Sequence, residues 1–371
     1  MMNTQISRRN FGRTAALLGA ASTLPFPNEH ALAQLSMIGP LPADAVKINA
    51  NENPMGPCPE AVEAMMGVIR GGGRYLYEET FNFGRVLAEQ EGLRPDYVRP
   101  FPGSSEPLHR AVLAFTSPEK SFVTADPGYE AGERAAQVVG ARVVKVPLTS
   151  GHAHDVKAMA KADPNAGLIY VCNPNNPTGT LTRRADLDWL VANKPAGAVV
   201  LVDEAYIHIA PSGKVSSDMV AADKDVLVLR TFSKLYGMAG LRAGAAMARP
   251  DILAKISQYG AGALPVTGMV GATASLKSKT LVPERRKIIA DVRTDVFEFL
   301  DKKGMSFVTS DSNKFMLDVK RPGYEVVNAM AAEKVFIGRV WSAWPTHVRV
   351  SIGTREEMAK FKTAITKVMQ A

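Results

Sequence analysis

The sequence DVLVLRTFSKLYGMAGLRAG, residues 225–244, joins an apolar run to a segment that is rich in glycine. The segment contains a serine, a lysine and an arginine, which are Ser233, Lys234 and Arg242. A glycine inside a helix costs about 1 kcal/mol relative to alanine. We therefore expect that the chain bends here, or that another group comes close to the backbone.

Two more apolar runs precede this one, GLIYVC at 167–172 and AVVLVDEAY at 198–206. Between them lies RRADLDWLVAN, residues 183–193, whose apolar positions have helical spacing. Buried strands that alternate with amphipathic helices predict an α/β fold, in which a mostly parallel sheet is covered by helices. In such sheets, ligands bind beyond the carboxyl ends of the strands.

The C-terminal part has a different pattern of short strands separated by helical stretches. These strands are predicted at FMLDVK (315–320), VFIGRV (335–340) and HVRVSIG (347–353), and they indicate a smaller α+β domain. The predicted division is a signal peptide at 1–33, an N-terminal arm that belongs partly to the small domain at 34–66, a large domain at 67–260 and the small domain at 261–371.

The first residues have the layout of an export signal. Arg8, Arg9 and Arg13 precede an apolar run, and Ala31-Leu32-Ala33 offers a cleavage site of small residues. Arg8-Arg9 followed by Phe11 resembles the twin-arginine type, whose route carries folded proteins and often their cofactors. We therefore expect export, most simply to the periplasm. The alternative is a disordered basic N-terminus on a cytoplasmic protein.

Composition excludes several classes of protein. The net charge is +8, but the basic residues are scattered among acidic ones and no nucleic-acid motif is present. No stretch has the roughly 20 apolar residues that span a bilayer. Cys58 and Cys172 are the only cysteines. One disulfide is open to them, although two unpaired buried thiols are expected, and nothing has zinc-ligand spacing.

Polar residues follow each predicted strand of the large domain. CNPNNPTGT (172–180) is a rigid turn that carries asparagines, Asp203 and Tyr206 end the second run, and Ser233 and Lys234 end the third. Upstream, PGSSEPL (102–108) predicts a helix N-terminus, which is a phosphate site, and DPGYEAG (126–132) places an aromatic ring at another turn.

These residue types suit one cofactor, a pyridine ring with a phosphate, a phenolic oxygen and an aldehyde. A helix N-terminus, hydroxyl groups and an arginine bind a phosphate, and a carboxylate keeps the ring nitrogen protonated. Lys234 is suited to form a Schiff base and to move a proton. The sequence therefore predicts a pyridoxal 5'-phosphate site.

The chain resembles the class I/II aminotransferases of fold type I, and within them the histidinol-phosphate aminotransferase branch. The resemblance covers nearly all of 45–365. It is carried, in order, by ANENPMGP, RYLYEE, GSSEP, CNPNNPTG, VDEAY, FSKLYGMAGLRAG and VRVSIGTREE. Any one of these motifs is weakly specific, but seven in the family's order are strongly specific.

The resemblance implies a role for each candidate residue. Lys234 is the Schiff-base lysine, Asp203 pairs with the ring nitrogen, and Asn176 and Tyr206 contact the phenolic oxygen. The remaining cofactor contacts are the stacking Tyr129 and, around the phosphate, Ser104, Ser105, Glu106, Ser233 and Arg242. Tyr75 reaches the phosphate across a homodimer interface. Arg349 holds the substrate carboxylate, with Arg339, Asn51 and Asn53 also on the substrate side.

The function implied is transamination between an amino acid, or a related amine, and a 2-oxo acid. Decarboxylation, racemisation or C–S cleavage on the same cofactor are alternatives, as is a binding or regulatory protein that retains the fold. Trp341 and Trp344 lie near the expected substrate arginines. They either shape a side-chain pocket or pack the small domain. Because histidine biosynthesis is cytoplasmic, an export signal argues against adopting that branch's substrate.

Overall fold

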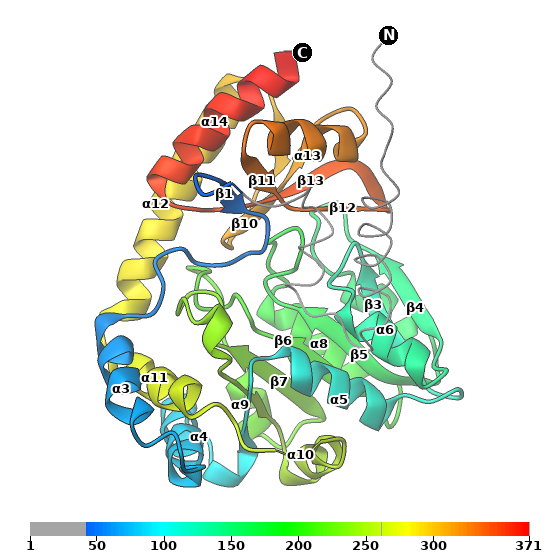
Figure 1. Ribbon diagram of the computed structural model, residues 1–371. Coiled ribbons are helices and arrows are strands. Elements are labelled where there is room, and N and C mark those ends of the chain that lie inside the picture. Colours follow the sequence, from blue (N-terminus) through cyan, green and yellow to red (C-terminus); the bar gives the residue numbers. More distant parts are fainter. Residues whose placement is uncertain (1–41, 261, 371) are drawn as a thin grey trace, which may run out of the picture.

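The computed structural model describes residues 42–260 and 262–370, so the predicted signal peptide lies outside the described residues. A seven-stranded sheet forms its largest layer, in the order β2-β8-β7-β6-β5-β3-β4 (Figure 1). The strands are β2 (Val98–Phe101), β3 (Ser121–Asp126), β4 (Val143–Pro147), β5 (Ala166–Cys172), β6 (Val199–Asp203), β7 (Val226–Thr231) and β8 (Gly244–Met247). Only β8 runs antiparallel to its neighbours, which confirms the mostly parallel sheet.

The three predicted strands of this sheet are confirmed as β5, β6 and β7, and every residue in them is buried. The helices of this part are α4 (Tyr77–Glu91), α5 (Ser105–Phe115), α6 (Ala131–Val138), α7 (Val156–Lys161), α8 (Arg184–Asn193), α9 (Ser217–Ala221) and α10 (Pro250–Ser257). Helices α5 and α6 pack on each other, as do α7 and α8. Crossover helices of this kind are what parallel strands require.

A four-stranded antiparallel sheet, in the order β12-β13-β10-β9, forms the second layer of strands. Its strands are β9 (Ser306–Val308), β10 (Lys314–Asp318), β12 (Val340–Trp341) and β13 (Trp344–Ser351). Helices α12 (Leu281–Lys302), α13 (Gly323–Ala332) and α14 (Arg355–Gln370) accompany it (Figure 1). The predicted strand at 335–340 divides into β11 (Val335–Ile337) and β12, because the chain leaves the extended path at Gly338 and Arg339.

The N-terminal arm joins both parts of the chain. Strand β1 (Val46–Ile48) pairs in parallel with β11, whereas α3 (Pro59–Ile69) packs against α11 (Val266–Lys277). Helix α11 also packs against α4. The domain boundaries at residues 66 and 260 stay predictions.

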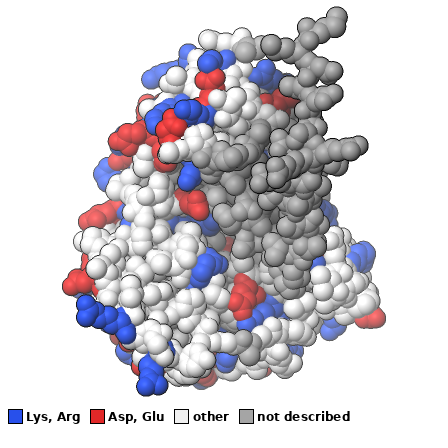
Figure 2. All heavy atoms as spheres, in the orientation of Figure 1, with Lys and Arg blue, Asp and Glu red and all other residues white. Residues whose placement is uncertain are grey.

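Lys and Arg residues alternate with Asp and Glu residues over the visible surface of the described chain (Figure 2). Both cysteines are buried and unpaired, as expected. Within residues 42–260 and 262–370, no helix is long and apolar enough to cross a membrane. In the same ranges, no group of three or more His, Cys, Asp or Glu side chains is placed to hold a metal ion.

Candidate active site

A cavity of about 410 Å³ lies beyond the carboxyl ends of β5, β6 and β7, which is where the α/β fold places a ligand. Its volume is in the range of small-molecule sites. Cys172, Asp203 and Thr231, the last residues of these three strands, all line it. Nine predicted site residues also lie on its wall: Ser104, Ser105, Tyr129, Asn176, Asp203, Tyr206, Ser233, Lys234 and Arg242.

One side of the cavity has the donor set of a phosphate site. Ser104 and Ser105 stand at the N-terminus of α5, where backbone N–H groups are unpaired by the helix. Arg242 donates to Ser233 Oγ at 3.3 Å and to the carbonyl of Pro102 at 2.8 Å. A guanidinium, hydroxyl groups and a helix N-terminus fit a phosphate group.

Glycine at position 103 makes this arrangement sterically possible. Gly103 has a φ of +95°, and a Cβ built on it would lie 2.4 Å from Arg242 Nη2. Gly244 has a similar function, because a Cβ there would lie 2.6 Å from the backbone of Gly103. At Gly244, the close approach expected in the opening segment is therefore made by the backbone of Gly103. Gly240, by contrast, lines the cavity and faces open space.

Lys234 is buried on the wall of the cavity. Its Nζ donates to the carbonyl of Ala50 at 3.4 Å and lies 5.7 Å from the centroid of the Tyr206 ring. The segment that follows β1 therefore covers this lysine. Asn53 contributes to the same closure, since its Nδ2 donates to the carbonyl of Leu235 at 2.8 Å.

Asp203 is a buried carboxylate with two hydrogen-bond donors. The Tyr170 hydroxyl donates to Oδ2 at 3.0 Å, and the N–H of Ala205 donates to Oδ1 at 3.1 Å. Burial raises the pKa of Asp203 to about 6, although these hydrogen bonds and the nearby lysines act in the opposite direction. Tyr170 was not predicted as a site residue. The only signal in the sequence is a tyrosine hydroxyl inside the apolar run GLIYVC.

Arg349 and Asn51, both predicted on the substrate side, make hydrogen bonds to neighbouring segments. Arg349, fully buried on β13, donates to Asn176 Oδ1 at 3.0 Å and to the carbonyl of Asn49 at 2.6 Å. Asn51 Nδ2 donates to the Tyr206 hydroxyl at 3.2 Å. Both residues therefore contact residues that line the cavity.

Arg339, also predicted on the substrate side, is buried and forms an ion pair with Glu130. Its guanidinium is 4.1 Å from the centroid of the Trp341 ring, and that of Arg349 is 5.5 Å from the same ring. Trp341 is 2% exposed, and its Nε1 donates to the carbonyl of Gly128 at 2.9 Å. Trp341 thus packs the interior and at the same time orients both arginines.

Two predicted cofactor contacts, Glu106 and Tyr75, lie outside the cavity wall in the single chain, as do the four residues predicted on the substrate side. The Glu106 carboxylate is paired with Arg110, one turn along α5, so its backbone N–H is the group it can offer to a phosphate. Tyr75 is 70% exposed and stacks on Tyr77, with 5.3 Å between the ring centroids. Its predicted contact requires a second chain and stays a prediction.

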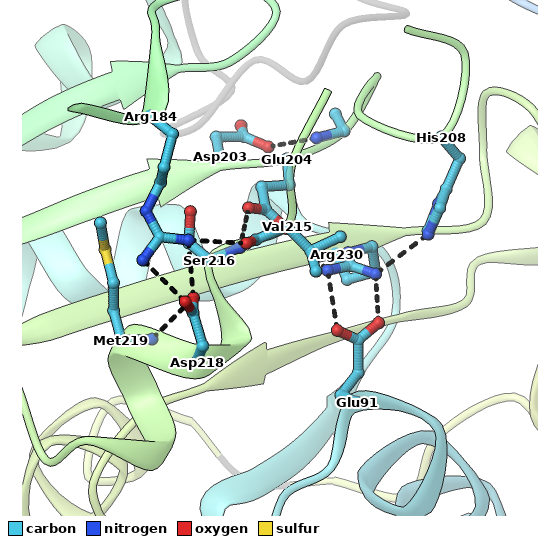
Figure 3. A network of polar contacts seen from close by, with 11 residues as sticks. Glu91, Arg184, Asp203, Glu204, His208, Val215, Ser216, Asp218, Met219 and Arg230 are labelled. Atoms are coloured by element: carbon cyan, nitrogen blue, oxygen red, sulfur yellow. Dashed lines mark hydrogen bonds and ion pairs between the residues drawn. The ribbon is translucent and has the colours of Figure 1, made fainter. Parts of the chain in front are cut away.

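A buried ionic network joins the residue after β6 to β7 and α4 (Figure 3). Arg230 donates to Glu91 Oε1 at 2.5 Å and to Glu204 Oε2 at 2.6 Å, and it contacts His208 Nε2 at 3.1 Å. Glu204 also accepts from the N–H of Ser216 at 2.7 Å. Because Glu204 directly follows Asp203, the network fixes the backbone that carries the site carboxylate to α4.

The model of the family described as aminotransferase class I and II matches residues 43–365. The chain belongs to the class I and II aminotransferases. This aminotransferase has the fold of the type I pyridoxal-phosphate transferases, and its family membership makes it a pyridoxal-phosphate-dependent transaminase. The phosphate-type donors of the cavity, and the space that Gly103 leaves for Arg242, fit that cofactor.

Similar proteins agree with this assignment. The histidinol-phosphate aminotransferase of Moorella thermoacetica is 32% identical over 88% of this aminotransferase and 86% of that protein. The one from Symbiobacterium thermophilum is 33% identical over 87% and 90%, respectively. The crystal structure of histidinol-phosphate aminotransferase from Sinorhizobium meliloti in complex with pyridoxal-5'-phosphate superposes with a TM-score of 0.83 at 23% identity, covering 99% of both chains.

Proposed function

We propose that this aminotransferase exchanges an amino group between an amino acid, or a related amine, and a 2-oxo acid whose carboxylate Arg349 binds. One observation carries the proposal. Lys234 lies in a cavity whose wall carries a phosphate-type donor set, while Arg349 binds Asn176 on that same wall. The bidentate guanidinium suits a carboxylate.

Bound pyridoxal phosphate supplies an aldehyde and an electron-withdrawing ring. Around it, Lys234 provides the amine that attaches the cofactor, and its Nζ takes and returns a proton. Asp203 Oδ would accept a hydrogen bond from the protonated ring nitrogen. Asn176 and Tyr206 would hold the phenolic oxygen, and Tyr129 would cover a ring face.

Arg339 points to a second anionic group on the substrate. Its Nε and Nη2 are buried and have no hydrogen-bond partner within the described part of the chain. Buried guanidinium nitrogens without a partner are costly, so a phosphate or a second carboxylate from the substrate would satisfy them. The relatives from Moorella thermoacetica and Symbiobacterium thermophilum are named histidinol-phosphate aminotransferases, and the phosphate of such an amine is one group that would satisfy Arg339.

Single-turnover spectroscopy tests the proposed reaction. Purified protein loaded with pyridoxal phosphate is mixed with one amino acid or amine at a time, without any oxo acid. We expect the visible band to convert to that of the amine form, with one oxo product released per site. Turnover without accumulation of the amine form would instead indicate a decarboxylase, racemase or lyase. Failure to bind the cofactor would indicate a binding protein.

We also propose a homodimer. Large apolar side chains are exposed on α3, on α4 and on the connection between them, namely Val62, Met66, Ile69, Tyr75, Tyr77 and Phe81. A soluble protein seldom leaves so many apolar side chains together in water. A second copy would cover them through a two-fold interface, and it would place Tyr75 near its partner's site.

Phe81→Glu is therefore expected to weaken the dimer. Phe81 is 74% exposed in the single chain, so the change should leave the fold of the subunit intact. A charge in an apolar interface should lower dimer affinity at least about 100-fold and cofactor affinity with it. Sedimentation velocity and cofactor titration measure both. Tyr259→Glu, at an exposed residue beyond α10, is the control, and equal behaviour of the two variants would contradict the proposed interface.

For localisation, we propose export by the twin-arginine route with cleavage after Ala33. The support is the arrangement of Arg8, Arg9, Phe11 and Ala31–Ala33 in the sequence. Mass spectrometry of the protein from a periplasmic fraction should find an N-terminus at Gln34. Cytoplasmic protein that keeps residues 1–33 would contradict export.

A further inference from the structure

A second lysine, Lys314, is buried beside the cavity. It is the first residue of β10 and has no exposed surface. Its Nζ donates to Ser312 Oγ at 2.9 Å and lies 3.1 Å from the centroid of the Tyr206 ring. Lysines are rarely fully buried, so the position of this one against the ring of a proposed cofactor ligand requires an explanation.

The register of the small sheet places Lys314 next to the substrate arginine. In the β10–β13 ladder, Lys314 is opposite Ser351 and Met316 is opposite Arg349. Alternate residues of a strand share a face, so Lys314 and Arg349 project from the same face as diagonal neighbours. That face borders the cavity, since Arg349 donates to Asn176.

The groups around Lys314 belong to the reacting centre. The Tyr206 ring that it contacts also has Lys234 Nζ within 5.7 Å. Asp203 and Cys172 are close enough that the charge of Lys314 lowers their pKa values, against the effect of burial. The ammonium of Lys314 therefore acts on the proposed ring-nitrogen partner, the phenol and the attachment lysine together.

We propose that Lys314 is a positioning residue that disfavours a proton on Lys234 Nζ and strengthens the hydrogen bond donated by Tyr206. The inference rests on the proposed function. A like charge nearby disfavours a second positive charge, and an unprotonated amine is the form that attacks and accepts a proton. A cation on the ring face stabilises negative charge on the phenol. The hydroxyl of Tyr206 therefore becomes a better hydrogen-bond donor.

Lys314→Met tests this proposal, because it removes the charge and keeps a long apolar side chain. The protein is loaded with pyridoxal phosphate, and its visible absorbance is titrated with pH at constant ionic strength. The apparent pKa of the absorbance band should rise by about one unit or more, a tenfold shift in the proton equilibrium. Lys314→Arg, which retains the charge, should restore most of the native value.

Lys194→Met is the matched control. Lys194 is a largely buried lysine paired with Asp225, which precedes β7 at the end opposite to the site. The absorbance band of the loaded Lys194→Met variant should titrate as in the native protein. If Lys314→Met does not fold, Lys314→Gln, which can keep a hydrogen bond to Ser312, gives the same reading. If the band of Lys314→Met or Lys314→Gln titrates as in the native protein, and the variant still transaminates, this inference is overturned and the proposed function is not. A native protein with no visible band would overturn the proposed function instead.

Discussion

Lys234→Ala is expected to abolish transamination and the covalent attachment of pyridoxal phosphate, with a loss of at least about 10⁴-fold in kcat. Attachment and proton transfer both depend on this one amine, so no other side chain compensates. Lys314, the nearby buried lysine, is committed to Ser312 and to the Tyr206 ring. The measurement is the visible spectrum of the loaded protein, with borohydride trapping followed by mass spectrometry.

The control for this prediction is Lys194→Ala, which removes a lysine from the opposite end of β7. It should trap the cofactor as the native protein does. Lys234→Ala should keep the native unfolding transition, because a buried lysine is replaced by a small apolar side chain. Cofactor trapped on Lys314 or on any other lysine in the variant would show that Lys234 is not the attachment point.

The site residues that could be predicted from local pattern are those that come at the ends of predicted strands. Asp203 and Lys234 come directly after buried apolar runs, and strand order in a parallel sheet brings such residues together. The motif order then added Arg349, which lies far along the chain and on the second sheet. Asp203 and Lys234 need only local pattern and one fold rule, whereas Arg349 was implied by the resemblance to the family.

The residues that were missed are those whose burial is decided by distant segments. Lys314 begins a short strand, where a lysine usually lies in water, and only its register against β13 shows that it is buried. Tyr170 occupies an apolar run, and its hydroxyl acquires a role only through Asp203 on the next strand. Gly237, in the opening segment, shows the close approach expected there, because the carbonyl of Gly56 lies 2.0 Å from where its Cβ would be; the sequence did not show which segment approaches. Tyr75, by contrast, was predicted, and its contact stays a prediction because it requires a second chain.

Asp203→Asn should lower kcat about 10²- to 10³-fold, because one preorganised charge at the ring nitrogen is lost. The substitution should also change how the free energy of unfolding depends on pH. Burial raises the pKa of Asp203 to about 6 in the folded protein, above the ordinary value of 3.8. Without cofactor, the folded state thus binds this proton more tightly than the unfolded state does. The contribution of Asp203 to the free energy of unfolding is therefore present at about pH 4 and is lost as the pH rises through about 6.

The variant carries no such titration, so cofactor-free Asp203→Asn should be more stable than the native protein above about pH 6, by on the order of 3 kcal/mol. The two proteins should converge near pH 4. With pyridoxal phosphate bound, the order should reverse, because the carboxylate then pairs with the protonated ring nitrogen. Urea unfolding of both forms at several pH values measures this. Tyr170→Phe is the matched variant: it removes only the donor to Asp203 Oδ2 and should cost about tenfold in activity. The contradicting result is a cofactor-free Asp203→Asn variant that is less stable than the native protein above about pH 6. The protein would then stabilise the ionised carboxylate without the cofactor ring.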